Sequence, residues 1–189
     1  MAFLTEEQLK KMGFKSLGKN IKISDKASIY GCENISIGND VRIDDFCAFS
    51  GKITIGNNVH IATLSHLAGG AQGITIEDFA GIAFGVHIFT ETDDYSGEYL
   101  TNPTVPLKYR KRIEKEVIIK RHAIVGAKSL ILPGVILEEG TAIGAMSLVN
   151  KSTKPWLIYM GMPARAIKRR NNELLKYEEQ YFNEKNTIK

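Results

Sequence analysis

The chain has 189 residues, a length that predicts one domain with a sizeable core. It has 25 basic and 21 acidic residues, so its net charge is +4. Basic residues are spread out except in "ARAIKRR" near the C-terminus, and no aromatic-rich basic stripe predicts a nucleic-acid partner. "MAFLTEEQLKKMG" carries acids where a signal peptide is apolar, and no apolar run is long enough for membrane insertion. Cys32 and Cys47 lack metal-ligand spacing and indicate a reducing compartment. The sequence therefore predicts a cytoplasmic protein.

The first predicted element is a short helix over residues 5–13, inside an N-terminal segment that spans residues 1–16. Thr5 and Gln8 have the spacing of a capping pair, and Gly13 is a typical helix end.

From residue 17 onward an aliphatic residue falls at every sixth position, apart from three breaks. The series is Leu17, Ile23, Ile29, Ile37, Ile43, Phe49, Ile55, Ile61, Leu67, Ile76, Ile82, Ile88, Ile119, Val125, Ile131, Leu137, Ile143 and Val149. The residue two places earlier is usually small or apolar, as at Cys47, Ser65 and Ala123, and both positions point inward on a short strand. This period predicts a β-solenoid of hexapeptide repeats, with three faces per coil and about six coils.

The three breaks all follow the third strand of a coil, so each insertion is expected to leave the solenoid along one edge. The spacing is eight from Ile29 to Ile37, nine from Leu67 to Ile76 and thirty-one from Ile88 to Ile119. The last insertion, residues 90–117, contains "DDYSG" and two prolines, which favour an ordered arm. This edge is therefore predicted to be a binding edge.

The last predicted element is a helix over residues 172–185, "NELLKYEEQYFNEK", in a C-terminal segment of residues 171–189. Its apolar residues are expected to cover the last coil, because solenoids need caps. They are Leu174, Leu175, Tyr177, Tyr181 and Phe182.

The chain resembles the hexapeptide-repeat acyltransferases, above all the maltose, galactoside and O-antigen sugar acetyltransferases. The likeness spans residues 17–170 and is most specific in "ILPGVILEEGTAIGAMSLVNKSTKPWLIYMGMPARAIKRR". It implies an all-β fold, a left-handed parallel β-helix whose coils occupy residues 17–170. It also implies a homotrimer that binds acetyl-CoA, with no metal, between neighbouring solenoids, and an inserted arm that contacts the next chain.

The resemblance also carries over a cofactor site, residue by residue. Ala127 in "VGAKS" and Ala145 in "IGAMS" match positions where small residues let the pantetheine chain approach the backbone. Asn150 and Lys151 occupy the next matched positions. Arg165 and Lys168 in "PARAIK" match basic residues that reach the phosphates of the cofactor. The alternative is that the alanines merely fit the turns and the cations face water.

The catalytic base of the galactoside-type enzymes is a histidine in the arm, and this chain has Asp93 at the matched position. His66 and His87 precede the same corner on successive coils, so they are expected to share one outer face beside the arm, with His60 one face away. His66 is the leading candidate for the base, oriented by Asp93 or Asp94, with His87 and Asp93 as alternatives. An amine acceptor could also need no base.

Asp94 and Tyr95 could bind the sugar or brace the arm. Neither cysteine suits a nucleophile, since Cys47 points inward and Cys32 lies in a distant insertion. The resemblance thus implies direct transfer of acetyl from acetyl-CoA to a hydroxyl or amino group of a sugar, nucleotide-linked or a precursor of a surface polysaccharide.

Two other classes share this scaffold. A γ-type carbonic anhydrase needs three converging histidines, and no two histidines here have the required spacing of five. A non-catalytic assembly module remains the other alternative, against which "GMPARAIK" argues.

Overall fold

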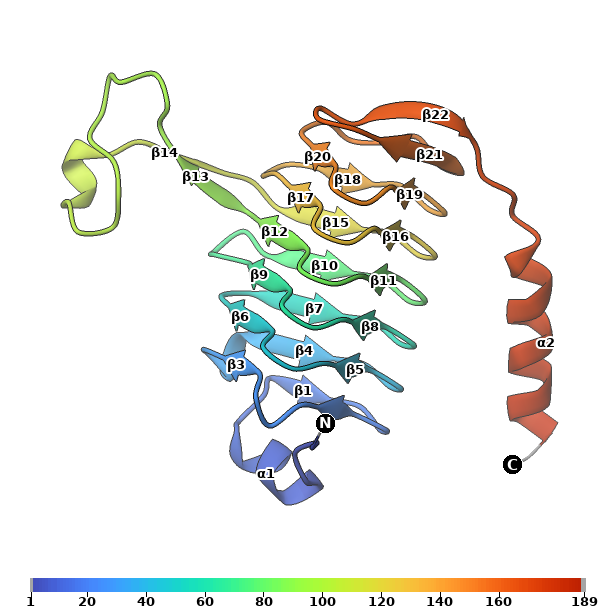
Figure 1. Ribbon diagram of the computed structural model, residues 1–189. Coiled ribbons are helices and arrows are strands. Elements are labelled where there is room, and N and C mark those ends of the chain that lie inside the picture. Colours follow the sequence, from blue (N-terminus) through green and yellow to red (C-terminus); the bar gives the residue numbers. More distant parts are fainter. Residues whose placement is uncertain (1, 188–189) are drawn as a thin grey trace.

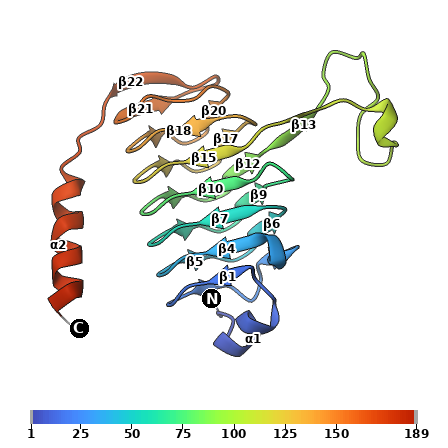
Figure 2. The same ribbon diagram turned by 180° about the vertical axis from the view of Figure 1, so that it is seen from behind.

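The computed structural model describes residues 2–187 and is a solenoid of short strands stacked in three sheets (Figures 1 and 2). Residue 1 and residues 188–189, which belong to the expected terminal segments, lie outside the described residues. The first sheet contains β1 (Ser16–Leu17), β4 (Ile35–Ile37), β7 (Ile53–Ile55), β10 (Ile74–Ile76), β15 (Val117–Ile119) and β18 (Ile136–Leu137). The second contains β2 (Lys22–Ile23), β5 (Arg42–Ile43), β8 (His60–Ile61), β11 (Gly81–Ile82), β16 (Ile124–Val125), β19 (Ala142–Ile143), β21 (Leu157–Met160) and β22 (Arg165–Arg169). The third contains β3 (Ser28–Ile29), β6 (Ala48–Ser50), β9 (His66–Ala68), β12 (His87–Phe89), β17 (Leu130–Ile131) and β20 (Leu148–Val149).

The chain visits the three sheets in turn, so each sheet gains one strand per coil. Strand pairing is parallel and keeps the repeat in register, as in Ile43↔Ile61 and Ile61↔Ile82. Six coils are complete, and β21 pairs in parallel with β19 as a partial seventh turn. The predicted hexapeptide solenoid of about six coils is confirmed.

The core lies inside the three-sided prism and consists of the repeat positions. All of them are buried except Leu17 and Ile29, which are half-buried in the first coil. Phe49, the aromatic exception in the series, has 0% exposure. Cys47, Ser65 and Ala123 are buried too, as the alternation along a strand predicts. Burial of one such large apolar side chain stabilises the fold by about 1.5–3 kcal/mol. The repeated burial keeps the coils stacked although their strands are short.

All three insertions leave at the corner between the third and the first sheet, as predicted. The first contains the short 3₁₀ helix η1 (Cys32–Asn34). The longest forms an arm that projects from the solenoid in Figure 1, and two antiparallel strands form its base, β13 (Glu91–Asp93) and β14 (Arg112–Glu114). A second 3₁₀ helix, η2 (Leu107–Tyr109), lies further out. Arg112 pairs with Glu91 at 3.0 Å and with Glu114 at 2.7 Å, so the base of the arm is tied by charge as well as by backbone bonds.

Both ends of the solenoid are covered, but not entirely by the predicted elements. At the bottom, α1 (Glu6–Lys11) has the expected capping box of Thr5 and Gln8 and buries Leu9. At the top, the antiparallel hairpin of β21 and β22 covers the last coil, which the sequence analysis missed. Trp156 at its start lies so close to Gly140 that a Cβ there would clash.

The expected position of the C-terminal helix is wrong. Helix α2 (Leu174–Thr187) does not cover the last coil but runs back down beside the solenoid (Figures 1 and 2). The Tyr181 hydroxyl donates to Asn58 Oδ1 at 3.0 Å, and Lys185 Nζ donates to Asp40 Oδ2 at 2.7 Å. The physical reason is that the hairpin already occupies the end, which leaves the apolar residues of the helix to pack against the turns.

Candidate active site

The corner between the second and the third sheet, here the second corner, carries the alanines expected to contact the cofactor. It consists of residues 24–27, 44–47, 62–65, 83–86, 126–129 and 144–147. The N–H of Met146 donates to the carbonyl of Ala127 at 2.8 Å, and the N–H of Lys128 donates to that of Phe84 at 2.8 Å. Ala145 and Ala127 therefore head a column of equivalent turn positions that Phe84 continues one coil lower.

The backbone N–H groups of this column are open. Among the described residues they donate no hydrogen bond at Asp45, Thr63, Phe84, Ala127 and Ala145. A buried or ligand-covered amide needs an acceptor, so a molecule lying along this corner would have to supply carbonyl oxygens. The amide groups of a pantetheine chain have such oxygens.

The corner between the first and the second sheet is built differently. There the N–H of Lys19 donates to Asn39 Oδ1 at 2.8 Å, and that of Asn39 donates to Asn57 Oδ1 at 2.8 Å. The N–H of Asn57 continues the ladder to Asp78 at 2.6 Å. Asparagine and aspartate reach back to a neighbouring amide, whereas alanine and phenylalanine cannot. Side chains thus satisfy the turn amides in the three lowest coils of the first corner, whereas the equivalent amides of the second corner, from Asp45 to Ala145, stay open.

The basic residues of the closing hairpin lie above this corner. Arg165 pairs with Met160, whose side chain covers Gly144, so Arg165 lies just beyond Ala145. Lys168 pairs with Ile158, further along the second sheet. Both cations are exposed. The structure thus brings Ala127, Ala145 and Arg165 to one edge, with Lys168 nearby.

Asn150 and Lys151 are not brought to this edge within one chain. They follow β20 and lie at the far end of the third sheet, where the other insertions leave. Both residues are exposed. A ligand would touch them and Ala145 together only by crossing the third sheet or by lying between two copies of the chain.

His66 and His87 share the outer face of the third sheet, as predicted. They are paired in the register of β9 and β12, and their ring centroids are 5.9 Å apart at 74°. The ring of Phe89 lies 5.6 Å from that of His66. Burial, and then the charge that His87 can carry, lower the pKa of His66. The neutral imidazole that accepts a proton is therefore favoured at neutral pH.

Asp93 and Asp94 do not orient either histidine. The backbone N–H of Asn102 donates to Asp93 Oδ2 at 2.9 Å, so this carboxylate braces the arm. Asp94 accepts hydrogen bonds from the Ser96 hydroxyl at 2.8 Å and the Gly97 N–H at 3.1 Å, and the bond from Ser96 above all keeps its pKa below the ordinary value. No side-chain hydrogen bond joins His66 to another described residue. The expected carboxylate partner for His66 is therefore absent from the described part of this chain.

Tyr95, which follows the two aspartates, is 91% exposed. Its ring is thus available at the base of the arm, but nothing in one chain covers it.

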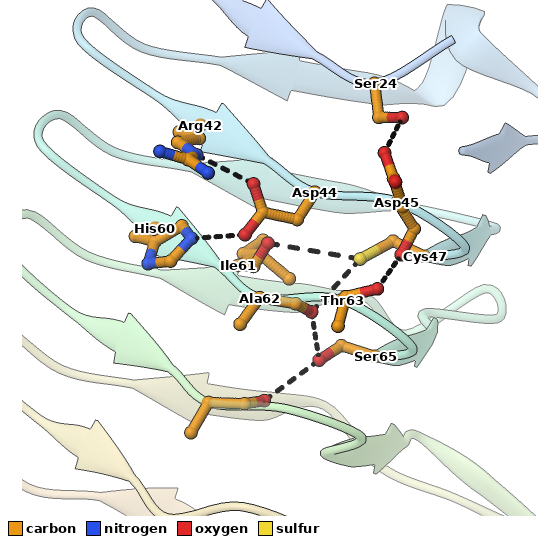
Figure 3. A network of polar contacts seen from close by, with 11 residues as sticks. Ser24, Arg42, Asp44, Asp45, Cys47, His60, Ile61, Ala62, Thr63 and Ser65 are labelled. Carbon is orange, nitrogen blue, oxygen red and sulfur yellow. Dashed lines mark hydrogen bonds and ion pairs between the residues drawn. The ribbon is translucent and has the colours of Figure 1, made fainter. Parts of the chain in front are cut away.

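A carboxylate-oriented histidine does exist on the next face, which the sequence analysis did not single out (Figure 3). His60 Nε2 lies 2.8 Å from Asp44 Oδ2, and Arg42 Nε donates to Asp44 Oδ1 at 2.7 Å. Burial alone would raise the pKa of Asp44, but the bonds from His60 and Arg42 together hold it below its ordinary value. The signal was present, since Arg42 and His60 are 18 residues apart and so stack one coil above the other.

The cysteines have the inert surroundings that the alternation predicts. The thiol of Cys47 donates to the carbonyl of Ala62 at 3.2 Å (Figure 3), and burial raises its pKa to about 11. Burial also raises the pKa of Cys32. A raised pKa disfavours the thiolate at neutral pH, so neither cysteine suits a covalent nucleophile.

A second carboxylate–histidine contact is structural. His122 is 6% exposed, and its Nε2 lies 3.1 Å from Glu178 on α2, which also pairs with Arg121. Arg170 donates to the carbonyls of His122 and Gly140 at 2.8 Å and 3.0 Å. These contacts fasten α2 to the solenoid.

Within residues 2–187, no three histidine, cysteine or acidic side chains gather closely enough to hold a metal ion. Across the same residues, no helix is both long and apolar enough to span a membrane.

Comparison with known proteins places the chain among acyltransferases. No family model matches it. It is 50% identical over 181 residues to the dTDP-4-amino-4,6-dideoxy-D-glucose acyltransferase of Escherichia coli, with 94% of each chain covered. The solved structure of AntD, an N-acyltransferase from Bacillus cereus in complex with dTDP and 3-hydroxybutyryl-CoA, is 48% identical at a TM-score of 0.96 and covers 97% of this chain and 98% of its own. A variant of AntD was solved with dTDP-4-amino-4,6-dideoxyglucose and coenzyme A.

A hexapeptide-repeat acetyltransferase from Vibrio cholerae, solved with acetyl coenzyme A, shares the fold at 18% identity and a TM-score of 0.58, over 87% of this chain and 75% of its own. The open second corner, the period of six and the likeness over almost the whole length agree. The chain therefore belongs to the hexapeptide-repeat acyltransferases and transfers an acyl group from a CoA-bound donor to a sugar.

Proposed function

We propose that the enzyme transfers an acetyl group from acetyl-CoA to the 4-amino group of dTDP-4-amino-4,6-dideoxyglucose. The observation that carries this choice of acceptor is the 50% identity, over 94% of both chains, to an acyltransferase named for that sugar. The sequence of the arm is consistent with an amine acceptor, because Asp93 occupies the position at which galactoside-type enzymes have a histidine. An amine needs less help from a base than a hydroxyl does, because its neutral form is already nucleophilic.

The donor half of the site is the second corner with the hairpin above it. The open amides of Ala127 and Ala145 bind carbonyl oxygens of the pantetheine chain, and small side chains leave room for it. Arg165 and Lys168 bind the phosphates as charge-assisted donors. Asn150 and Lys151 contact the cofactor from the far end of the third sheet.

The chemical step is direct aminolysis of the thioester. The amine nitrogen attacks the carbonyl carbon, and backbone amides stabilise the oxyanion that forms. Collapse breaks the C–S bond and forms the amide. His66 accepts the proton lost by nitrogen and returns it to the departing thiolate, while His87 lowers its pKa and Asp93 holds the arm in place. Asp94 and Tyr95 bind the acceptor sugar at the base of the arm.

The complete site forms in a cytoplasmic homotrimer. A cleft between two copies would let one ligand reach both the second corner and Asn150, which a single chain holds apart. The exposed arm would then contact the next copy. The product is a precursor sugar for a surface glycan.

The test is release of CoA thiol from acetyl-CoA with dTDP-4-amino-4,6-dideoxyglucose, beside the same amino sugar without its nucleotide. Turnover that needs both the amine and the nucleotide supports the proposal. Equal rates with the free sugar, or no thiol release with either, would refute it.

A further inference from the structure

Phe84 lies directly below the two alanines of the donor column. Ala145 and Ala127 occupy this position in the two coils above, and the hydrogen bond from the Lys128 N–H places Phe84 next, one coil lower. The N–H of Gly85 donates to the carbonyl of Thr63 at 2.9 Å, so the column continues below the phenylalanine. A benzyl group thus follows the two methyl groups of Ala145 and Ala127 in the column.

The Phe84 ring is largely exposed and makes no ring or cation contact within residues 2–187. Phe84 is 59% exposed, and among the described residues no aromatic ring or cation lies against it. Its neighbours Ala83 and Gly85 are small, and even a Cβ at Gly85 would meet only Lys128, at 3.7 Å. More than half of the ring surface is therefore accessible to a ligand beside the open amide of the same residue.

Its height on the column fixes what it can contact. A cofactor held at Arg165 descends past Ala145 and then Ala127, at about 4.8 Å per coil, the spacing of neighbouring strands. The next position is that of Phe84. The sulfur end of the pantetheine chain and the acyl group are the parts of the donor that arrive there, since the phosphates are bound at the top.

We infer that the Phe84 ring limits the length of the acyl group and makes acetyl the preferred one. This inference rests on the proposed function and deepens it. The similar enzyme AntD of Bacillus cereus was solved with 3-hydroxybutyryl-CoA, whose acyl group is longer than acetyl, so the length of the acyl group needs an explanation. Acetyl fits in front of the ring, whereas a four-carbon chain runs into it. One methylene in a shaped apolar pocket changes kcat/KM by about 10–200-fold.

The experiment measures kcat/KM for acetyl-CoA and butyryl-CoA with dTDP-4-amino-4,6-dideoxyglucose. Phe84→Ala should raise the ratio of butyryl to acetyl by about 10-fold or more, and Phe84→Leu should raise it by less. Phe46→Ala is the matched control, since Phe46 is 58% exposed at the same corner but two coils lower, and it should leave the ratio unchanged. Because Phe84 is exposed, the melting temperatures of Phe84→Ala and Phe84→Leu should stay near that of the wild type.

The outcomes separate the two proposals. A ratio within twofold of the wild type in both Phe84 variants overturns the acyl limit and leaves the proposed function standing. A change in KM for the amino sugar without a change in the ratio does the same, because the ring would then contact the acceptor. If the wild type turns over no acyl-CoA with this sugar, both proposals fall.

Discussion

His66 and His87 lie on successive coils with their ring centroids 5.9 Å apart, and no carboxylate of residues 2–187 forms a hydrogen bond or ion pair with either ring. Two imidazoles at this distance cannot both be protonated without repulsion. His66 is the more buried of the two, and burial and then the charge of His87 lower its pKa. The pair thus supplies a neutral acceptor without the aspartate that usually orients a catalytic histidine.

Loss of His66 should lower the rate. If it takes the proton of the amine, His66→Ala should reduce kcat by about 100-fold or more, the order expected for a general base. The acidic limb of the rate profile in the wild type should lie below pH 6.5, the ordinary value for histidine, because the pKa of His66 is lowered. His87→Ala removes one cause of that shift and should move the limb upward. A His66→Ala enzyme near the wild-type rate would show that the amine reacts without this base.

The second corner should not tolerate a large side chain beside the cofactor. Ala145→Leu adds bulk at an exposed turn position, so it should raise KM for acetyl-CoA by about 10-fold or more, the cost of a shape mismatch of a few methyl groups. The control is Ala71→Leu, an exposed alanine in a third-corner insertion. If both variants bind acetyl-CoA as the wild type does, the cofactor does not lie along this column.

The hairpin cations should act on the phosphate end of the donor alone. Arg165→Ala and Lys168→Ala should each weaken acetyl-CoA by about 10-fold, since a hydrogen bond to a charged group is worth about 1.5–3 kcal/mol. Neither variant should change the rate with S-acetylpantetheine, which has no phosphate. An equal loss with both donors would mean that the hairpin affects the chemical step or the fold.

His122 should make the fold sensitive to acid. Burial, followed by the charges of Arg121 and Arg170, lowers the pKa of His122 from 6.5 against the opposing charge of Asp78, while Glu178 also pairs with Arg121. Below pH 6.5 the unfolded chain therefore binds a proton that the folded chain resists, and stability falls as the pH falls. The thermal midpoint should drop between pH 7 and pH 5, and His122→Gln should flatten that drop. A variant with an unchanged pH profile would contradict this account.

The fold could be predicted from sequence because one physical rule fixes it. Each coil buries its aliphatic residues only against its neighbours, so a period of six defines strands, corners and the edge from which insertions leave. The position of helix α2 does not follow from this rule. Leu174 and Tyr181 could pack against any apolar surface, and the sequence around Asn58 does not indicate that Tyr181 is its partner. The hairpin "LIYMGMPARAIKRR" has no period of six, so its strands were missed.

The site was only partly predictable. Ala127, Ala145 and Arg165 were found through a motif, and the structure places them at one edge. The open amides could not be found from a motif, because they depend on which side chains accept a hydrogen bond from a turn amide. At the first corner Asn39 accepts one from Lys19, whereas no side chain of the described residues accepts one from Ala127 or Ala145 at the second corner. The Asp44–His60 contact could have been found from the spacing of 18 that stacks His60 on Arg42.

The choice of an amine over a hydroxyl is tested by a competition between two acceptors that differ in one group. Equal amounts of dTDP-4-amino-4,6-dideoxyglucose and dTDP-6-deoxyglucose are incubated with acetyl-CoA and the wild-type enzyme, and both products are measured by mass spectrometry. We expect one acetyl group on the amino sugar and none on the hydroxyl sugar. Acetylation of the hydroxyl sugar at an equal or greater rate would contradict this expectation and would assign the site to O-acetylation.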